Sequence, residues 1–199
     1  MLKGISPNMN ILLLSGSARN PNNTLRVSLA LKKIVENEHD VRLIDFRAYD
    51  IPLLAQGGFN KENISPFQAE LIAGFEWAQL VVILSPEYNW SITPELLNML
   101  QLLPNKPYDK LLDEKVFALV GTSTGKGGKV PALQLTQILN KVISFGNMNS
   151  IVSPRIFEAH FIKEVLDEDG NSLGNMQFDQ GLLDFMNYSL RVSKRWTGK

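Results

Sequence analysis

The feature that most constrains the fold is a series of short, almost uninterrupted apolar runs. A strand with one face in water alternates apolar and polar residues, whereas a strand covered on both faces is apolar throughout. Runs of the second kind predict parallel strands inside a layered α/β domain. There are five of them: "NILLLS" (10–15), "VRLIDF" (41–46), "LVVILS" (80–85), "VFALVG" (116–121) and "SIVSPRIF" (150–157).

Segments with helical spacing separate the runs. Strands that alternate with helices predict right-handed crossovers. Five strands with about five helices suit a flavodoxin-like, doubly wound parallel sheet in the order 2-1-3-4-5. Thr93 followed by Pro94 is a typical helix start. Apolar residues recur every three or four positions in 27–35, 67–78, 135–143 and 182–190.

Length and composition limit the classes of protein that fit. The 199 residues suit one domain, 1–199, and we expect 1–8 to be a flexible N-terminal extension. Twenty basic and 20 acidic residues balance, which gives no electrostatic reason to expect nucleic acid or an anionic membrane as partner. The absence of cysteine excludes disulfides, iron–sulfur clusters and thiolate catalysis.

Metal sites and membrane insertion also find no support in the sequence. The chain has two histidines, too few for a histidine metal cluster, and we expect no metal. No apolar run approaches the roughly 20 residues of a membrane span. The first ten residues lack the apolar region of a signal peptide. We therefore expect a cytoplasmic protein.

The loops after the first, third and fourth strands are the expected site. In doubly wound sheets, ligands bind beyond the carboxyl ends of the strands, where the strand order reverses. The loops 15–24, 85–94 and 121–129 lie there and are rich in Ser, Thr, Asn and Gly. The irregular segments 47–63 and 158–178 either carry function or only connect elements.

The first loop, "SGSARNPNNT", leads directly into a helix. A helix start presents free N–H groups and a positive dipole end, which favours a bound phosphate. Simple capping by one of the polar residues is the alternative, but it does not account for a serine and an arginine together. The candidate phosphate contacts are Ser17, Arg19, Asn22, Asn23 and Thr24.

The second loop, "PEYNWS" (86–91), combines aromatic and polar residues. Tyr88 and Trp90 could flank a flat ligand, while Asn89 and Ser91 offer polar contacts. The alternative is an aromatic loop packed on the domain or on a second subunit. The residue pattern alone leaves both interpretations open.

The third loop, "GTSTGKGGKVP" (121–131), allows the backbone to approach a ligand closely. It matches the G-x-S-x-G nucleophile elbow, but Glu158 and His160 are poor triad partners for Ser123 because they are near neighbours in one loop. It is one residue too short for a Walker A loop, and Gly127 stands where Ser or Thr is needed. The remaining interpretation is a glycine-rich rim against a planar cofactor. The "DEDGNSLG" segment (167–174) lacks the calcium-loop spacing and predicts a turn.

The ordered motifs resemble the landmarks of the NADPH-dependent FMN reductase family. That family includes quinone, chromate and azo-dye reductases of flavodoxin-like fold. The resemblance runs from about residue 9 to 190 and is most specific in the P-E-Y-N stretch. The segments that show the resemblance are "GSARNPNNTLRVSLA", "PEYNWSITPELLNML", "GTSTGKGG" and "LDEDGNSLG".

The resemblance implies roles for individual residues. Ser17 and Arg19 match phosphate contacts, while Asn22 and Thr24 stand where the family usually has serine and asparagine. The second loop matches the segment along the isoalloxazine ring, with Trp90 where a small residue is common. The predicted cofactor-binding residues are Ser17, Arg19, Asn22, Asn23, Thr24, Pro86, Glu87, Tyr88, Asn89, Trp90, Ser91, Ser123, Thr124 and Gly125.

The resemblance also implies an activity. We expect FMN and NADPH or NADH as cofactors, a quinone, free flavin or other small molecule as electron acceptor, and a homodimer or homotetramer. No catalytic side chain is expected, because the flavin carries the chemistry. The family's P-G after Ser91 is replaced by Thr93-Pro94, and its Lys-Asn by Leu97-Asn98. The alternatives are a flavodoxin-like electron carrier, and a family member with weakened flavin binding that acts as a structural or regulatory protein.

Overall fold

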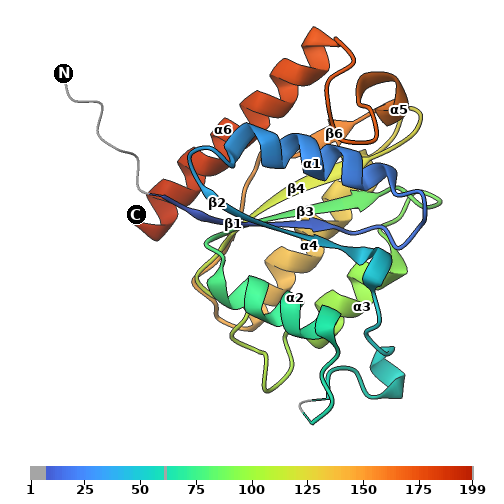
Figure 1. The fold of residues 1–199 in the computed structure, drawn as a ribbon. Helices are drawn as coiled ribbons and strands as arrows, with labels where there is room; N and C mark the ends of the chain where they lie inside the picture. Colours follow the sequence, from blue (N-terminus) through green and yellow to red (C-terminus); the bar gives the residue numbers. More distant parts are fainter. Residues whose placement is uncertain (1–7, 61, 199) are drawn as a thin grey trace.

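A parallel β-sheet with helices on both faces forms the protein (Figure 1). The computed structural model describes residues 8–60 and 62–198. The elements, in chain order, are β1 (Asn10–Ser15), α1 (Asn23–Val35), β2 (Asp40–Asp45), η1 (Phe46–Ala48), η2 (Leu54–Gln56), α2 (Pro66–Trp77), β3 (Leu80–Pro86), α3 (Pro94–Leu102), β4 (Val116–Thr122), α4 (Lys129–Phe145), β5 (Ile151–Val152), β6 (Phe157–Ala159), α5 (Ile162–Val165) and α6 (Met176–Thr197).

The order of the strands confirms the flavodoxin-like prediction. The sheet runs β2-β1-β3-β4-β5, with β6 also paired to β4, and every pair within it is parallel. The three central strands are almost completely buried, as continuously apolar strands should be. The strand order reverses at β1 and β3, so the expected ligand crevice lies beyond their carboxyl ends.

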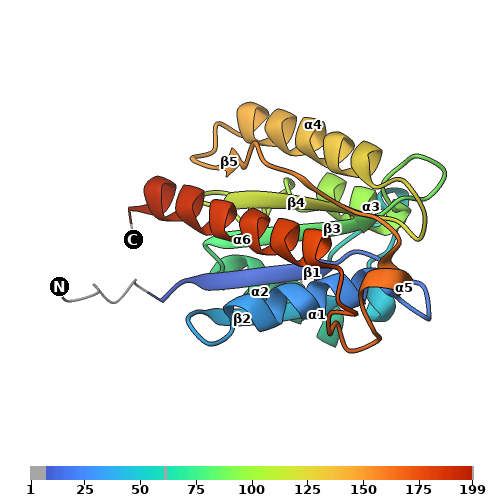
Figure 2. The same ribbon diagram turned by 90° about the horizontal axis from the view of Figure 1, so that it is seen from above.

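Each face of the sheet carries its own apolar layer. Because successive side chains of a strand point to opposite faces, Leu12 and Leu14 pack with α2, α3 and α4, whereas Ile11 and Leu13 pack with α1, α5 and α6. Figure 1 shows α1 and α6 on one side of the sheet and α2 and α4 on the other, and Figure 2 shows α1 and α6 lying in front of the strands when the sheet is seen from above. The loops that follow the strands lie beyond the carboxyl ends of the sheet, outside both layers.

The prediction of one continuous fifth strand is wrong. In place of one strand over 150–157 the structure has two short ones, β5 and β6. The N–H of Ser153 still donates to the carbonyl of Phe117 at 2.7 Å, but Pro154 follows and has no N–H to continue the ladder. The chain therefore leaves β4 after Ser153 and rejoins it at Phe157.

Several local predictions are confirmed. Thr93 caps α3 with Pro94 at its first position, and the 167–174 segment forms a turn closed by a bridge between Leu166 and Ser172. Of the expected extension 1–8, residues 1–7 lie outside the described residues, and Asn8 donates through Nδ2 to the Asp40 carboxylate at 2.7 Å.

Neither a membrane-spanning helix nor a cluster of metal ligands occurs in the described part of the chain. No helix in it has the length and apolar character needed to cross a membrane. Nor do three or more His, Asp or Glu side chains within residues 8–60 and 62–198 gather into a group that could hold a metal ion.

Candidate functional site

The three predicted loops meet at one edge of the sheet. They follow β1, β3 and β4, which are adjacent and in register, with Pro86 opposite Thr122 at the carboxyl end. Hydrogen bonds join the loops directly: Thr93 Oγ1 donates to the carbonyl of Gly16 at 2.8 Å, and the Glu87 N–H donates to the carbonyl of Thr122 at 2.9 Å. The sequence therefore located the three site loops correctly relative to one another.

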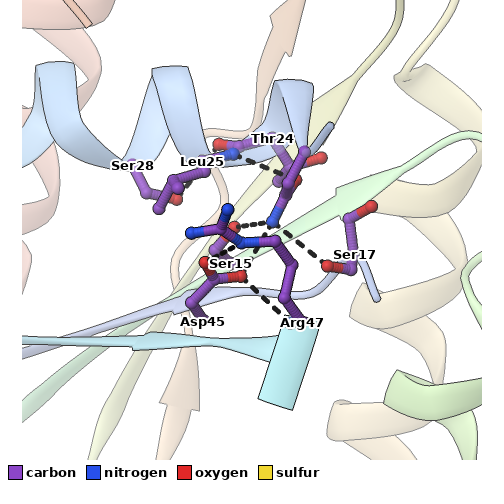
Figure 3. A network of polar contacts seen from close by, with 8 residues as sticks. Ser15, Ser17, Thr24, Leu25, Ser28, Asp45 and Arg47 are labelled. Atoms are coloured by element: carbon purple, nitrogen blue, oxygen red, sulfur yellow. Dashed lines mark hydrogen bonds and ion pairs between the residues drawn. The ribbon is translucent and has the colours of Figure 1, made fainter. Parts of the chain in front are cut away.

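The side chain of Asn22 organises the first loop. Figure 3 shows three of its partners, Ser15, Ser17 and Asp45, gathered in one network of polar contacts. Its Oδ1 accepts the N–H of Leu25 at 3.2 Å, which makes Asn22 the N-cap of α1. Its Nδ2 lies 2.9 Å from Ser15 Oγ, 3.1 Å from the carbonyl of Ser17 and 3.0 Å from Asp45 Oδ1. The residue is only 6% exposed. The structure therefore uses this amide to fix the loop and the helix start, and both of its polar atoms are bonded within the protein.

The next two residues lie at the start of α1 in different environments. Thr24 is buried, and its Oγ1 lies 2.9 Å from Oγ1 of Thr122, which ties the helix start to the end of β4. Asn23 Oδ1 is buried, and among the described residues it has no hydrogen-bond donor. An unpaired buried oxygen is costly, so this position favours a ligand that brings a hydroxyl or other donor.

Ser17, Arg19 and Tyr88 come together from two loops. The Tyr88 hydroxyl lies 3.0 Å from Ser17 Oγ, and the Arg19 guanidinium carbon lies 3.8 Å from the centre of the Tyr88 ring. Ser17 is buried and Arg19 is exposed. Two of the five predicted phosphate contacts therefore share one aromatic neighbour.

The second loop is a tight hairpin turn. The N–H of Tyr88 donates to the carbonyl of Ser91, and the N–H of Ser91 donates to the carbonyl of Tyr88, both at 3.0 Å. Between them Asn89 and Trp90 have φ of 47° and 58°, as both central residues of a type I′ turn require. Trp90 is 74% exposed. No described residue accepts the N–H of Asn89 or Trp90, so both donors remain available at the tip.

The glycine-rich third loop is held from three directions. The N–H of Gly125 donates to Ser123 Oγ at 3.2 Å, that of Gly127 to His160 Nδ1 at 3.2 Å, and that of Gly128 to Glu87 Oε2 at 2.6 Å. The N–H groups of Thr124 and Lys126 have no acceptor among the described residues. In this loop the N–H groups of the three glycines are thus bonded, and those of Thr124 and Lys126 are free to meet a ligand.

The nucleophile-elbow interpretation of this loop finds no support in the geometry. No hydrogen bond among the described residues joins Ser123 to His160, whose Nδ1 is taken by the Gly127 N–H. The helix that should follow the elbow directly begins only at Lys129. The loop can bind and orient a ligand, but it lacks the pairing that activates a serine.

Three residues of this edge were missed from the sequence. Asp45 and Thr122 end β2 and β4, and His160 follows β6. The signal was available for the first two, because the last residue of a parallel strand lies at the ligand edge. His160 reaches the loop only through the pairing of β6 with β4, which the predicted unbroken fifth strand did not anticipate.

The chain resembles known flavin-linked oxidoreductases over most of its length. A model of the family described as NADPH-dependent FMN reductase matches residues 9–156. A protein of Oryza sativa subsp. japonica named "Probable NADPH:quinone oxidoreductase 2" is 26% identical over 189 residues, 92% of this chain and 90% of that protein.

Solved structures show the same fold. FerB, a flavoenzyme NAD(P)H:(acceptor) oxidoreductase from Paracoccus denitrificans, matches with a TM-score of 0.69 at 20% identity, over 92% of this chain and 98% of its own. The apo form of the NADH:FMN oxidoreductase EMOB matches with a TM-score of 0.61 at 18% identity, over 90% of this chain and 89% of its own.

Proposed function

The chain belongs to the NADPH-dependent FMN reductase family, and we propose that it passes electrons from a nicotinamide through bound FMN to a small acceptor such as a quinone or free flavin. Membership of this family makes it an oxidoreductase that uses FMN with NADPH or NADH. The proposal further includes one FMN-binding domain, a homodimer or homotetramer, and a cytoplasmic location.

The first loop suits the phosphate end of FMN. Arg19 supplies a cation with in-plane donors, and the capped start of α1 supplies N–H groups and a positive dipole end. The unpartnered Oδ1 of Asn23 would accept a hydroxyl of the ribityl chain. Asn22 and Thr24 contribute by holding the loop, since their side chains are bonded within the protein.

The other two loops suit the ring end. The free N–H groups of Asn89, Trp90, Thr124 and Lys126 can donate to carbonyl and nitrogen acceptors at the edge of a flat heterocycle. Such fixed donors stabilise negative charge on a bound ring without having to reorganise. FMN, when bound, supplies the redox chemistry. The exposed indole of Trp90 would limit which acceptors reach the ring.

A single observation carries the proposal: among the described residues, the second and third loops leave unpaired backbone donors at one sheet edge, beside the exposed Arg19 of the first loop. The test is anaerobic mixing of the FMN-loaded protein with NADPH or NADH in a stopped-flow spectrometer. With NADPH or NADH or both, we expect the absorbance of the oxidised flavin to bleach within seconds of mixing. Absence of bleaching with both nucleotides would refute the proposed enzymatic activity.

The phosphate assignment has its own test. Arg19→Ala removes a charge-assisted hydrogen bond worth about 1.5–3 kcal/mol, so the dissociation constant for FMN should rise roughly 10- to 100-fold. Riboflavin has the same ring and no phosphate, and its affinity should stay within about twofold. An equal loss for both flavins would show that Arg19 does not recognise the phosphate.

The two alternatives predict other outcomes. An electron carrier would keep its flavin oxidised with NADPH until a separate reductase is added. The balanced charge of the chain does not favour this class, since carriers that dock on partners tend to be acidic. A structural or regulatory family member would be colourless after purification and would not bind added FMN.

A further inference from the structure

Tyr88 reaches from the second loop into the first. In the sequence it sits within the segment expected along the flavin ring, yet its hydroxyl and its ring each contact a predicted phosphate contact. The hydroxyl lies 3.0 Å from Ser17 Oγ, and the ring lies beneath the Arg19 guanidinium at 3.8 Å. The side chain therefore lies against the loop that is predicted to bind phosphate.

The backbone of Tyr88 is held firmly enough to act as a support. Its N–H and carbonyl are both bonded to Ser91 across the hairpin turn, and the preceding Glu87 N–H is bonded to Thr122 at the end of β4. Ser17 is 3% exposed, so its hydroxyl has little freedom to move away from the tyrosine. The hydrogen bonds to Ser91 and Thr122 thus hold the backbone at Tyr88 in place, and the tyrosine side chain in turn restrains Ser17 and Arg19.

The contact with Arg19 selects one orientation of an otherwise mobile side chain. A guanidinium that lies flat on an aromatic ring keeps its N–H donors in the plane, where they can form paired bonds to phosphate oxygens. An exposed arginine without this support would have to be ordered when the ligand binds, and that ordering weakens affinity. Tyr88 therefore prepares Arg19 for an anion.

The contact with Ser17 has a matching effect. A serine hydroxyl has one donor and two acceptor positions. When the phenol donates to Ser17 Oγ, the serine hydrogen is directed elsewhere and can be donated to a phosphate oxygen. Both contacts of Tyr88 thus leave donor groups of the first loop turned to the same negatively charged group.

We propose that Tyr88 is a positioning residue of the phosphate end, which orders Ser17 and Arg19 and so makes the site prefer a phosphorylated flavin to riboflavin. This inference rests on the proposed FMN-binding function. It differs from the role expected from the sequence, in which Tyr88 lies against the isoalloxazine ring.

Two substitutions separate the two contacts. Tyr88→Phe keeps the ring under Arg19 and loses the hydroxyl, and Tyr88→Leu loses both. We expect the dissociation constant for FMN, measured by quenching of flavin fluorescence, to rise about 3- to 5-fold in the first and about 10- to 30-fold in the second. The dissociation constant for riboflavin should stay within about twofold of wild type in both.

The matched control is Tyr188→Leu on α6. Tyr188 also lies near arginines, with Arg191 and Arg155 at 5.1 and 5.9 Å from its ring, but it belongs to α6 and to none of the three loops. We expect this variant to bind both flavins as wild type does. Because Tyr88→Leu could unfold the turn, each variant's thermal melting is recorded, and Tyr88→Phe decides the matter if the leucine variant fails to fold.

A double-mutant cycle tests the route through Arg19. In the Arg19→Ala background, Tyr88→Leu should lower the preference for FMN over riboflavin by no more than the loss of the Ser17 contact, about 3- to 5-fold. Equal losses of FMN and riboflavin in the Tyr88 variants would overturn the inference and place the ring of Tyr88 against the flavin. Unchanged affinities for both would overturn it as well. Failure of the wild-type protein to bind either flavin would instead refute the proposed function.

Discussion

His39 is the buried imidazole that precedes β2, and it should make the protein sensitive to acid. The residue is 6% exposed, and its Nδ1 accepts the N–H of Met9 at 3.4 Å. Burial lowers the pKa of His39, the charge of Lys194 adds to that effect, and Glu38 and Asp40 oppose it. Below the ordinary histidine pKa of about 6.5 the unfolded chain therefore binds a proton that the folded protein resists.

The sign of the pH dependence follows. The contribution of His39 to stability is complete above about pH 6.5 and is lost as the pH falls from there toward the lowered folded value. We expect His39→Gln, which keeps an acceptor for Met9, to lose less stability than wild type between pH 7.5 and 5. Urea unfolding at a series of pH values measures the difference. Parallel curves for the two proteins would contradict the assignment.

Gly121 is a residue whose missing side chain is required. A Cβ at this position would lie 1.6 Å from the carbonyl oxygen of Gly128, so the third loop would have to move away from β4. We expect Gly121→Ala to cost about 1–3 kcal/mol of unfolding free energy and to weaken FMN binding. Urea denaturation and FMN titration measure the two effects.

The matched control for that substitution is Gly125→Ala. A Cβ on Gly125 would have no neighbour within 4 Å, so the unfolding free energy should stay within about 0.5 kcal/mol of wild type. If Gly121→Ala were equally neutral, the close approach of the third loop to β4 would not be a feature of the protein in solution.

Among the elements, the 88–91 turn combines a strained backbone with an exposed aromatic side chain. Left-handed backbone costs an ordinary L-residue about 1–2 kcal/mol, and asparagine and glycine tolerate it best. The ring of Trp90 recovers little of this by burial, since it is 74% exposed. We expect Trp90→Gly to raise the unfolding free energy of the flavin-free protein by about 1 kcal/mol. Strained backbone conformations are often found at functional sites, so the left-handed conformation of Trp90 suggests that this turn contributes to function.

The same substitution should impair the function. Removal of the indole should weaken FMN binding and expose the ring to larger acceptors, which titration and turnover with quinones of increasing size can measure. Asn89→Gly is the control, because it relieves less strain and leaves the indole in place. A Trp90→Gly variant that is less stable than wild type would mean that the indole packs against the protein.

The elements themselves were largely predictable, and their tertiary contacts were not. Continuous apolar runs identify β1, β3 and β4 because burial on both faces excludes polar residues, and Thr93-Pro94 marks a helix start through local chemistry alone. The bond between Tyr88 and Ser17 spans 71 residues, and that between His160 and Gly127 spans 33. Such contacts depend on register and side-chain direction, which local patterns do not encode.

For the whole molecule, an exposed apolar patch suggests how copies of the chain associate. Leu53, Leu54 and Leu97 are 55%, 50% and 37% exposed. They lie on segments joined by the bond from the Leu54 N–H to Asn98 Oδ1, at 3.0 Å. We expect the wild type to run as a dimer or tetramer and Leu97→Glu to run as a smaller species in size-exclusion chromatography with light scattering.

A leucine of equal exposure provides the control for assembly. Leu183 on α6 is 38% exposed, and Leu183→Glu should leave the mass of the particle unchanged. A monomeric wild type, or dissociation by Leu183→Glu and not by Leu97→Glu, would rule out the patch formed by Leu53, Leu54 and Leu97 as the contact between subunits.

The interruption at Pro154 also bears on how the molecule avoids unwanted polymers. An unpaired outer strand is a template on which another chain can add a strand, and natural sheets protect such strands by shortness, proline or charge. One border of this sheet ends in β5 and β6, of two and three residues. The other is β2, which carries Asp40, Arg42 and Asp45. Both borders therefore carry features that disfavour strand addition, and we expect copies of the chain to associate through surfaces other than the borders of the sheet.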